Sequence, residues 1–233
     1  MKGKRIVERR LIQSVSFVLF LCLNTNAVSA SHQTGNIQDT LWLRQKLQNG
    51  RIWIKKYQNI TGHEFFLTEA LAPGSITIDG RTFADQLMWY DIYNDRVVLM
   101  ISPGLFIEPP PENSESFTIS YMDSDYTFRY FGAMGYCQIL YDGSFTLVRK
   151  HIKEIKTITI DNSNDTFQEE HSDYIVDNER FLRLRNRRDL FTALADRKDE
   201  IRHFIREQGL WINVQNPASI IPVLEYYDSL SER

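Results

Sequence analysis

Apolar and polar residues alternate with a period of two along most of residues 51–185, a pattern that is typical of half-buried β-strands. Turn signals interrupt the alternation at regular intervals, at Asp79-Gly80, Asn94-Asp95, Asp123–Asp125 and Asp142-Gly143. Asp-Gly, and less strongly Asn-Asp, suit the positive φ angles of tight hairpin loops. The pattern therefore predicts antiparallel hairpins that follow one another in a meander.

The spacing of apolar residues changes to that of amphipathic helices over residues 186–230. Asn186 and Asp196 are the predicted N-caps of two helices, because each has an acidic residue three positions later. Gly209 is predicted to end the second helix, and Ser219 to cap a third. The apolar stripes of these helices indicate that they pack on the sheet.

These patterns together predict an α+β fold, an antiparallel β-meander with C-terminal helices packed on it. The meander is expected either as a curved sheet or as two packed sheets. Residues 31–233 are expected to form a single domain, strand-rich over residues 51–185 and helical over residues 186–230. The proline-rich stretch at residues 102–111 predicts a long connection between the second and third hairpins.

The first thirty residues have the pattern of a signal peptide. Five basic side chains precede the mostly apolar run Leu11–Leu23, and Val28-Ser29-Ala30 supplies small residues where a signal peptidase cleaves. The apolar run is shorter than the ~20 residues that a membrane-spanning helix needs. We therefore expect cleavage after Ala30 and an exported protein, periplasmic or secreted, with no transmembrane segment in the mature chain.

The charge balance limits the partners. The whole chain has 27 basic and 30 acidic side chains, and removing the leader's five basic and one acidic residues leaves 22 against 29, a net charge of −7. This charge argues against nucleic acid and against anionic membrane surfaces as partners. Cys137 is the one cysteine outside the leader, and its strand-like neighbours predict a small buried hydrophobe rather than a nucleophile.

Sequence motifs of catalysis, metal binding and cofactor binding are absent. The histidines outside the leader lie far apart without metal-ligand spacing, and the chain has neither a glycine-rich phosphate loop nor a Gly-x-Ser-x-Gly elbow. The acidic stretch at residues 161–173 departs from a calcium loop at Thr166 and Ser172, so we interpret it as a mobile hairpin tip. We predict no catalytic residues, no metal and no cofactor.

Aromatic side chains lie beside a carboxylate in one stretch, which makes Trp89, Tyr90, Asp91, Tyr93 and Arg96 the candidate ligand-binding residues. Strand alternation places Trp89, Asp91 and Tyr93 on one face and Tyr90 on the other, and the helices are expected to cover one of these faces. With a two-residue loop, Arg96 becomes a diagonal neighbour of Asp91. We therefore expect an ion pair that lowers the pKa of the Asp91 carboxyl, which favours a structural role over catalysis.

Four segments carry a further pattern: "WYDIYNDRVVL", "GYCQILYDGSFTL", "FTALADRKDEIRHFIREQGLWI" and "VLEYYDSL". In this order they resemble a family of exported, uncharacterised proteins from Bacteroidota, over residues 52–230. Asparagine is commoner in that family where this chain has Asp228. The resemblance implies an envelope or secreted protein and supplies no catalytic motif.

Three classes of function are consistent with the sequence. The first is a non-catalytic envelope protein that binds a partner protein or has a structural role. The second is a carrier of a small apolar or glycan ligand, suggested by 14 Phe, 11 Tyr and 4 Trp, and a large apolar cavity would favour it. The third is a hydrolase that uses a pair of carboxylates brought together by the fold, and a raised carboxyl pKa inside a cleft would favour it.

Overall fold

A computed structural model describes residues 37–47, 50–157 and 165–231. The signal peptide predicted for residues 1–30 lies outside the described residues, so cleavage after Ala30 and a single domain from residue 31 stay predictions. In the described part of the chain, no helix is both long enough and apolar enough to cross a membrane.

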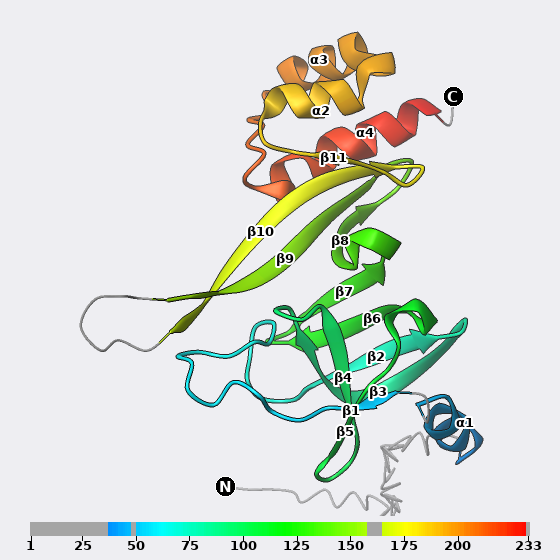
Figure 1. The fold of residues 1–233 in the computed structure, drawn as a ribbon. Coiled ribbons are helices and arrows are strands. Elements are labelled where there is room, and N and C mark those ends of the chain that lie inside the picture. The colour runs from blue at the N-terminus through cyan, green and yellow to red at the C-terminus, as the bar shows by residue number, and fades with distance from the viewer. Residues whose placement is uncertain (1–36, 48–49, 158–164, 232–233) are drawn as a thin grey trace, which may run out of the picture. The chain divides into compact units, whose positions relative to one another are not determined.

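Eleven antiparallel strands form one open sheet (Figure 1). Their spatial order is β1-β5-β4-β3-β2-β6-β7-β8-β9-β10-β11, so the chain returns from β5 to pair β6 with β2. The predicted α+β fold with an antiparallel meander is confirmed. The strands are β1 (Arg51–Ile52), β2 (Ala72–Ile78), β3 (Arg81–Asp91), β4 (Arg96–Ser102), β5 (Leu105–Glu108), β6 (Ser114–Tyr121), β7 (Ser124–Tyr130), β8 (Tyr136–Asp142), β9 (Thr146–Lys156), β10 (Thr166–Asp177) and β11 (Arg180–Arg183).

The hairpin turns follow the sequence signals in part. Asp79 and Gly80 have φ angles of 48° and 74° and join β2 to β3, as predicted. The turn between β6 and β7 is at Met122-Asp123, one residue before the predicted position. Residues 102–111 contain β5 where only a connection was predicted, because Leu105–Glu108 continues the sheet beside β4.

Two further segments differ from the prediction. The strand expected after residue 50 ends at Ile52, and residues 53–71 run without a regular strand over one face of the sheet. The predicted mobile tip at residues 161–173 is wrong from Thr166 onward, where β10 pairs with β9 through eleven consecutive residues.

The helices are α1 (Ile37–Leu47), α2 (Arg187–Ala193), α3 (Lys198–Glu207) and α4 (Ile221–Ser231). Asn186 forms the predicted capping box with Asp189 at the start of α2, and Gly209, with φ 61°, follows the end of α3. Asp196 does not cap α3; its carboxylate accepts a hydrogen bond of 2.8 Å from the Tyr227 hydroxyl of α4. Ser219 does not cap α4 either, since its hydroxyl bonds to the backbone of Asn213.

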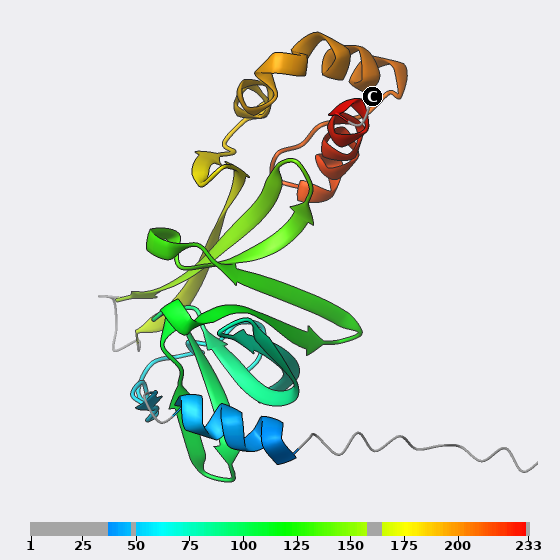
Figure 2. The same cartoon turned by 90° about the vertical axis from the view of Figure 1, so that its right-hand side faces the viewer.

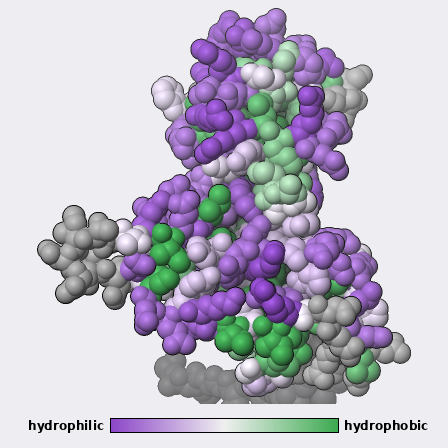
Figure 3. Space-filling view, in the orientation of Figure 1, coloured by the Kyte–Doolittle hydropathy of each residue, from purple (hydrophilic) through white to green (hydrophobic). Residues whose placement is uncertain are grey.

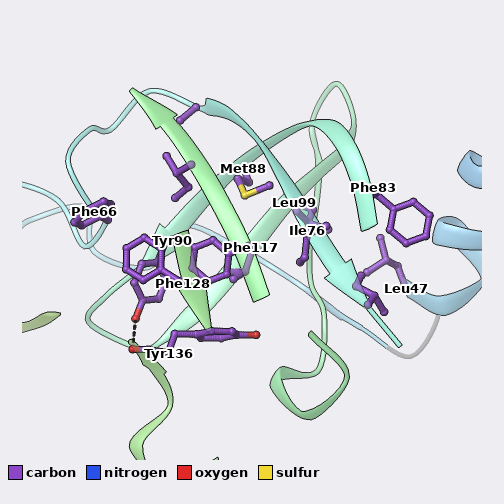
Figure 4. Packing of buried hydrophobic residues seen from close by; sticks show 14 of the residues in the cluster. Leu47, Phe66, Ile76, Phe83, Met88, Tyr90, Leu99, Phe117, Phe128 and Tyr136 are labelled. Atoms are coloured by element: carbon purple, nitrogen blue, oxygen red, sulfur yellow. Dashed lines mark hydrogen bonds between the residues drawn. The ribbon is translucent and has the colours of Figure 1, made fainter. Parts of the chain in front are cut away.

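The apolar core is divided between two ends of the sheet. Strands β2–β8 and α1 enclose one cluster, in which aromatic rings lie against aliphatic side chains (Figure 4). Tyr90, Phe117, Phe128 and Tyr136 form its centre, and the Tyr90 hydroxyl reaches the Tyr136 carbonyl at 3.4 Å.

The second cluster lies where α2, α3 and α4 pack on β8–β11 (Figure 2). Leu147 and Ile175 of the sheet meet Leu190, Ile201 and Leu224 of the helices there, and all five are fully buried. The helices thus pack on the sheet as predicted, but on β8–β11 rather than on β3. The face of β3 that carries Trp89 is covered instead by residues 53–69.

Candidate functional site

The structure separates the five candidate residues. Trp89 and Asp91 face residues 53–69, whereas Tyr90 is buried in the apolar core on the opposite face, as the strand alternation predicted. Tyr93 lies in the β3–β4 turn and packs edge-on against Tyr57 at a ring distance of 5.2 Å. Arg96 lies opposite Asp91 in the ladder.

The predicted ion pair between Asp91 and Arg96 is absent from the described part of the chain. The hairpin loop is Ile92–Asp95 rather than two residues, which shifts the register, and the Arg96 guanidinium donates to the Asp95 carbonyl at 3.2 Å. Burial raises the pKa of the Asp91 carboxyl, although hydrogen bonds from Asn94 and Tyr93 oppose this rise. The predicted ion pair between Asp91 and Arg96 and the lowered pKa that it implied for Asp91 were therefore both wrong.

Asp91 instead fixes the conformation of its own turn. Its Oδ1 accepts hydrogen bonds from the backbone N–H groups of Tyr93 at 3.1 Å and Asn94 at 2.9 Å. Its Oδ2 accepts a third from the Asn94 side-chain amide at 2.7 Å. All three donors are neutral, so no cation is hydrogen-bonded to this buried carboxylate.

Residues 53–69 are held on β3 by backbone and ring contacts. The Phe66 N–H donates to the Tyr90 carbonyl at 2.8 Å, and the Ile92 N–H donates to the Glu64 carbonyl at 3.1 Å. The Phe65 and Trp89 rings stack at 4.8 Å with an angle of 15° between their planes. Glu64 lies in this segment, outside the helices and strands. Because of these contacts it is buried beside Asp91.

A small pocket opens between this segment, the end of β3 and the end of β5. Its free volume is about 10 Å³, close to the ~10–15 Å³ that one water molecule needs. Three carboxylates reach it, from β3, from β5 and from residues 53–69. The rest of its wall is aromatic, amide, basic or aliphatic. It is lined by Arg51, Trp53, Ile54, Lys56, Tyr57, Glu64, Asp91, Asn94 and Glu108. We call it the acidic pocket.

Glu64 is the residue that sets this pocket apart. The residue is 1% exposed, and in the part of the chain that the structure describes only its own backbone N–H is hydrogen-bonded to its carboxylate. Burial raises the pKa of this carboxyl, and the nearby charge of Asp91 adds to the rise. A buried carboxylate without a cationic or polar partner is costly, because desolvation is not offset by hydrogen bonds.

Glu108, the third carboxylate, is neutralised. The Arg51 guanidinium donates to its Oε2 from Nε at 3.2 Å and from Nη2 at 2.7 Å. The pocket therefore has two buried carboxylates, Glu64 and Asp91, whose negative charges are not matched by an ion pair among the described residues.

Arg51 and Lys56 are the basic side chains that line the pocket, and Arg51 is paired with Glu108. Two further basic side chains nearby, Lys55 and Lys153, have other partners. Lys55 forms a 2.7 Å ion pair with Glu69. Lys153 of β9 donates to the carbonyls of His63, at 2.9 Å, and Phe65, and burial lowers its pKa. These cations weaken the negative potential around the acidic pocket but make no direct contact with its two unmatched carboxylates.

Apolar side chains are exposed next to the acidic pocket. Ile52 is 62% exposed, Ile54 is 68% exposed, and Leu105 on the neighbouring strand is also exposed. In the space-filling view, hydrophobic surface gathers over the region of β1 and β5 (Figure 3). We call these three residues the apolar edge.

Comparisons with known proteins add no identity. No protein-family model, no curated protein and no solved structure matches this chain. The resemblance to exported proteins of Bacteroidota therefore stays a prediction.

Sequence reasoning identified Asp91 and its aromatic neighbours but missed Glu64, Glu108 and Trp53. Glu64 occurs in "GHEFF". Polar and apolar residues do not alternate in this segment, so the sequence does not predict which way Glu64 faces. Its burial arises from long-range packing of residues 53–69 on β3. Among the described residues, no group of three or more His, Cys, Asp and Glu side chains could hold a metal ion.

Proposed function

We propose that this is an exported, non-catalytic binding protein whose acidic pocket receives the ammonium group of a lysine from a partner protein. The observation that carries the proposal is Glu64, a fully buried carboxylate that lines the pocket without a partner from another residue in the described chain. Its charge, together with that of Asp91, is complementary to a cation.

The size of the pocket selects the cation. An ammonium group is about as large as a water molecule and fits a site that holds one, whereas a planar guanidinium does not. Trp53 and Tyr57 line the same pocket, and aromatic rings attract ammonium ions through their negative faces. A lysine donates up to three hydrogen bonds, which suits the two oxygens of Glu64 and the one acceptor position that three N–H donors leave on Asp91.

A protein is the favoured source of the ammonium group, because the pocket adjoins the apolar edge. Ile54 belongs to both, so a lysine that enters the pocket brings its apolar neighbours against Ile52 and Leu105. An exposed apolar surface beside a polar anchor is typical of protein interaction sites. Export itself is supported by the leader-like pattern of residues 1–30.

The test is calorimetric titration with a short peptide that has one lysine between apolar residues, compared with the same peptide carrying acetyl-lysine. We expect the lysine peptide to bind and the acetylated peptide not to bind. Glu64→Gln should weaken binding by about 2 kcal/mol, roughly thirtyfold in Kd, as for loss of one partner of a buried charge pair. Lys56→Met should strengthen binding, because Lys56 also lines the pocket and repels an incoming cation.

The matched control is Glu200→Gln on α3, an exposed glutamate far from β3 in the sequence. It removes the same charge and should leave the affinity unchanged. Equal affinity for the lysine and acetyl-lysine peptides, or equal losses for the Glu64 and Glu200 variants, would refute the proposal.

A carboxylate-based hydrolase is the second candidate, favoured by the raised pKa values of Glu64 and Asp91 at one pocket. The free volume of about 10 Å³ admits a water molecule but no substrate ring, and Asp91 is already occupied by three N–H donors. Hydrolysis of nitrophenyl glycosides or esters that is lost in Glu64→Gln would favour this candidate over the binding function.

A further inference from the structure

A second pocket lies between two loops that are distant in sequence. One is the 3₁₀ turn Gly132–Met134 after β7, and the other is the turn at Asn178-Glu179 between β10 and β11. Their walls enclose about 440 Å³, which is within the ~300–1,000 Å³ range of small-molecule sites. The pocket is separate from the acidic pocket, since the two share no lining residue.

Aromatic and aliphatic side chains make up most of the wall. Phe131 and Phe181 meet at a ring distance of 5.5 Å and an angle of 90°, and Met134, Ala133 and Tyr130 complete the lining. Phe131, Met134 and Phe181 also pack against a small buried cluster formed by Cys137, Val148 and Val176. The apolar wall therefore continues the protein interior and is not an isolated surface feature.

Backbone conformation fixes the shape of both loops. Gly132 and Gly135 have φ angles of 52° and 68°, and the Phe131 N–H donates to the Gly135 carbonyl at 2.9 Å, which closes the first loop. At the second loop, Asn178 and Glu179 both have positive φ, at 44° and 68°. The pocket walls are thus largely formed before any ligand arrives.

The charge of the pocket is negative. Among the described residues that line it, Glu179 is the only charged one. The Arg129 guanidinium lies 5.9 Å from the centre of the Phe131 ring, but it is paired with Asp142 through its two terminal nitrogens. A ligand in this pocket therefore contacts an apolar wall and one carboxylate, that of Glu179, which has no ion pair among the described residues.

We infer that this pocket binds a small amphiphile with an apolar, preferably aromatic, body and a cationic end that approaches Glu179. Rings of the ligand pack against Phe131 and Phe181, and its cation lies at the rim beside the carboxylate. This inference concerns a site other than the acidic pocket and does not depend on the lysine-binding function.

Three probes that share a phenylalkyl body and differ in the charge of their polar end test the inference by calorimetric titration. They are trimethyl(4-phenylbutyl)ammonium, 4-phenylbutanol and 4-phenylbutanoate. The bulky trimethylammonium head does not fit the water-sized acidic pocket, so binding there is excluded by size. We expect the ammonium probe to bind more tightly than the alcohol and the alcohol more tightly than the acid. An exposed carboxylate such as Glu179 gives about a two- to fivefold preference between successive charges.

Two variants separate the apolar contribution from the charge. Ala133→Trp fills the pocket from an exposed position, so it should remove binding of all three probes without unfolding the protein. Glu179→Gln should leave the alcohol bound and remove the preference for the cation. Ala195→Trp, on an exposed 3₁₀ turn near α3, adds the same ring elsewhere and should change nothing.

Melting curves of all variants establish that they are folded. Unchanged probe affinity in Ala133→Trp would overturn the site, as would failure of every probe to bind at millimolar concentration. Equal binding of the acid and the ammonium probe would overturn the cationic ligand class.

Discussion

Replacing Glu64 by glutamine should stabilise the free protein and make its stability less dependent on pH. The carboxylate is 1% exposed, lines a water-sized pocket and has no hydrogen-bond donor other than its own backbone N–H in the described chain. Leaving a buried polar group unsatisfied costs about 1–3 kcal/mol, and more for a charge. Because the glutamine amide is neutral but also lacks partners, we expect a gain of only about 1 kcal/mol at pH 7.5.

The direction of the pH dependence follows from the raised pKa. Burial raises the pKa of the Glu64 carboxyl above its ordinary value of 4.5, so the folded state binds a proton more tightly than the unfolded state. The contribution of the Glu64 carboxyl to the free energy of unfolding is then greatest below pH 4.5 and falls as the pH rises through the raised pKa. The advantage of Glu64→Gln should be absent in acid and complete at neutral pH.

The charges that face Glu64 come from several elements. Asp91 on β3 and Glu69 raise its pKa, and Lys55 lowers it, while the ammonium of Lys153 on β9 is attracted to Glu64. All four residues are present in both the parent and the Glu64→Gln protein, so the difference in stability between the two proteins is due to the replaced carboxylate. Thermal unfolding between pH 4 and pH 8 measures it, since about 1 kcal/mol shifts the Tm by ~2–4 °C for 150–250 residues.

Glu69→Gln is the matched control, because the Lys55 ammonium holds the pKa of this exposed carboxyl below its ordinary value. Its stabilising effect is present at neutral pH and is lost as the pH falls, so the variant should be unchanged or slightly less stable at pH 7.5. A Glu64→Gln protein that melts below the parent at pH 7.5, or a difference that is constant with pH, would refute the reasoning.

Three other outcomes are expected. Asp228→Ala should lower the free energy of unfolding in urea by about 1–2 kcal/mol, because the Asp228 carboxylate of α4 accepts hydrogen bonds from the Tyr141 hydroxyl and, at 3.1 Å, from the Ser144 N–H. Asp228→Asn should lower it less, and equal losses in the two variants would contradict this role. Lys153→Met should lower the free energy of unfolding by about 1–3 kcal/mol, since two backbone carbonyls lose their donor; an unchanged urea midpoint would contradict it. Deleting residues 187–233 should cause aggregation in light scattering, because the second apolar cluster loses its helices, whereas a soluble truncation that melts cooperatively would show that the helices form a separate domain.

The fold class could be predicted because local patterns determine most of the hairpins. Asp79-Gly80 specified its turn through positive φ angles, and strand alternation placed Tyr90 on the face opposite Trp89, which is the face that packs in the core. The β3–β4 turn was predicted at Asn94-Asp95 but begins two residues earlier. The Asp91 carboxylate accepts the N–H groups of the next residues, a turn motif that aspartate favours, and this signal was present in the sequence.

The acidic pocket could be predicted only in part, because its residues come from segments far apart in the chain. Asp91 was identified from the aromatic side chains beside it, but its partner in the pocket, Glu64, follows no regular strand pattern. The long-range pairing of Phe65 with Asp91 brings the two carboxylates together. No periodicity or spacing in a single sequence specifies such a contact, so the burial that raises the pKa of Asp91 was missed. The expected ion pair was wrong for a local reason, because the β3–β4 loop has four residues rather than two.

The treatment of other buried charges in this protein makes Glu64 informative. Asp173 is held by two hydrogen bonds from Arg149, at 2.7 and 2.9 Å, and Lys150 lies 2.8 Å from Asp95. The fold therefore neutralises a buried carboxylate on β10 and a half-buried one in the β3–β4 turn, and Arg51 does the same for Glu108 inside the acidic pocket itself. If Glu64 served stability alone, a glutamine or an aliphatic side chain would be the more favourable residue there. A carboxylate that is costly in the free protein and complementary to a cation is instead what a site needs when its ligand supplies the missing charge.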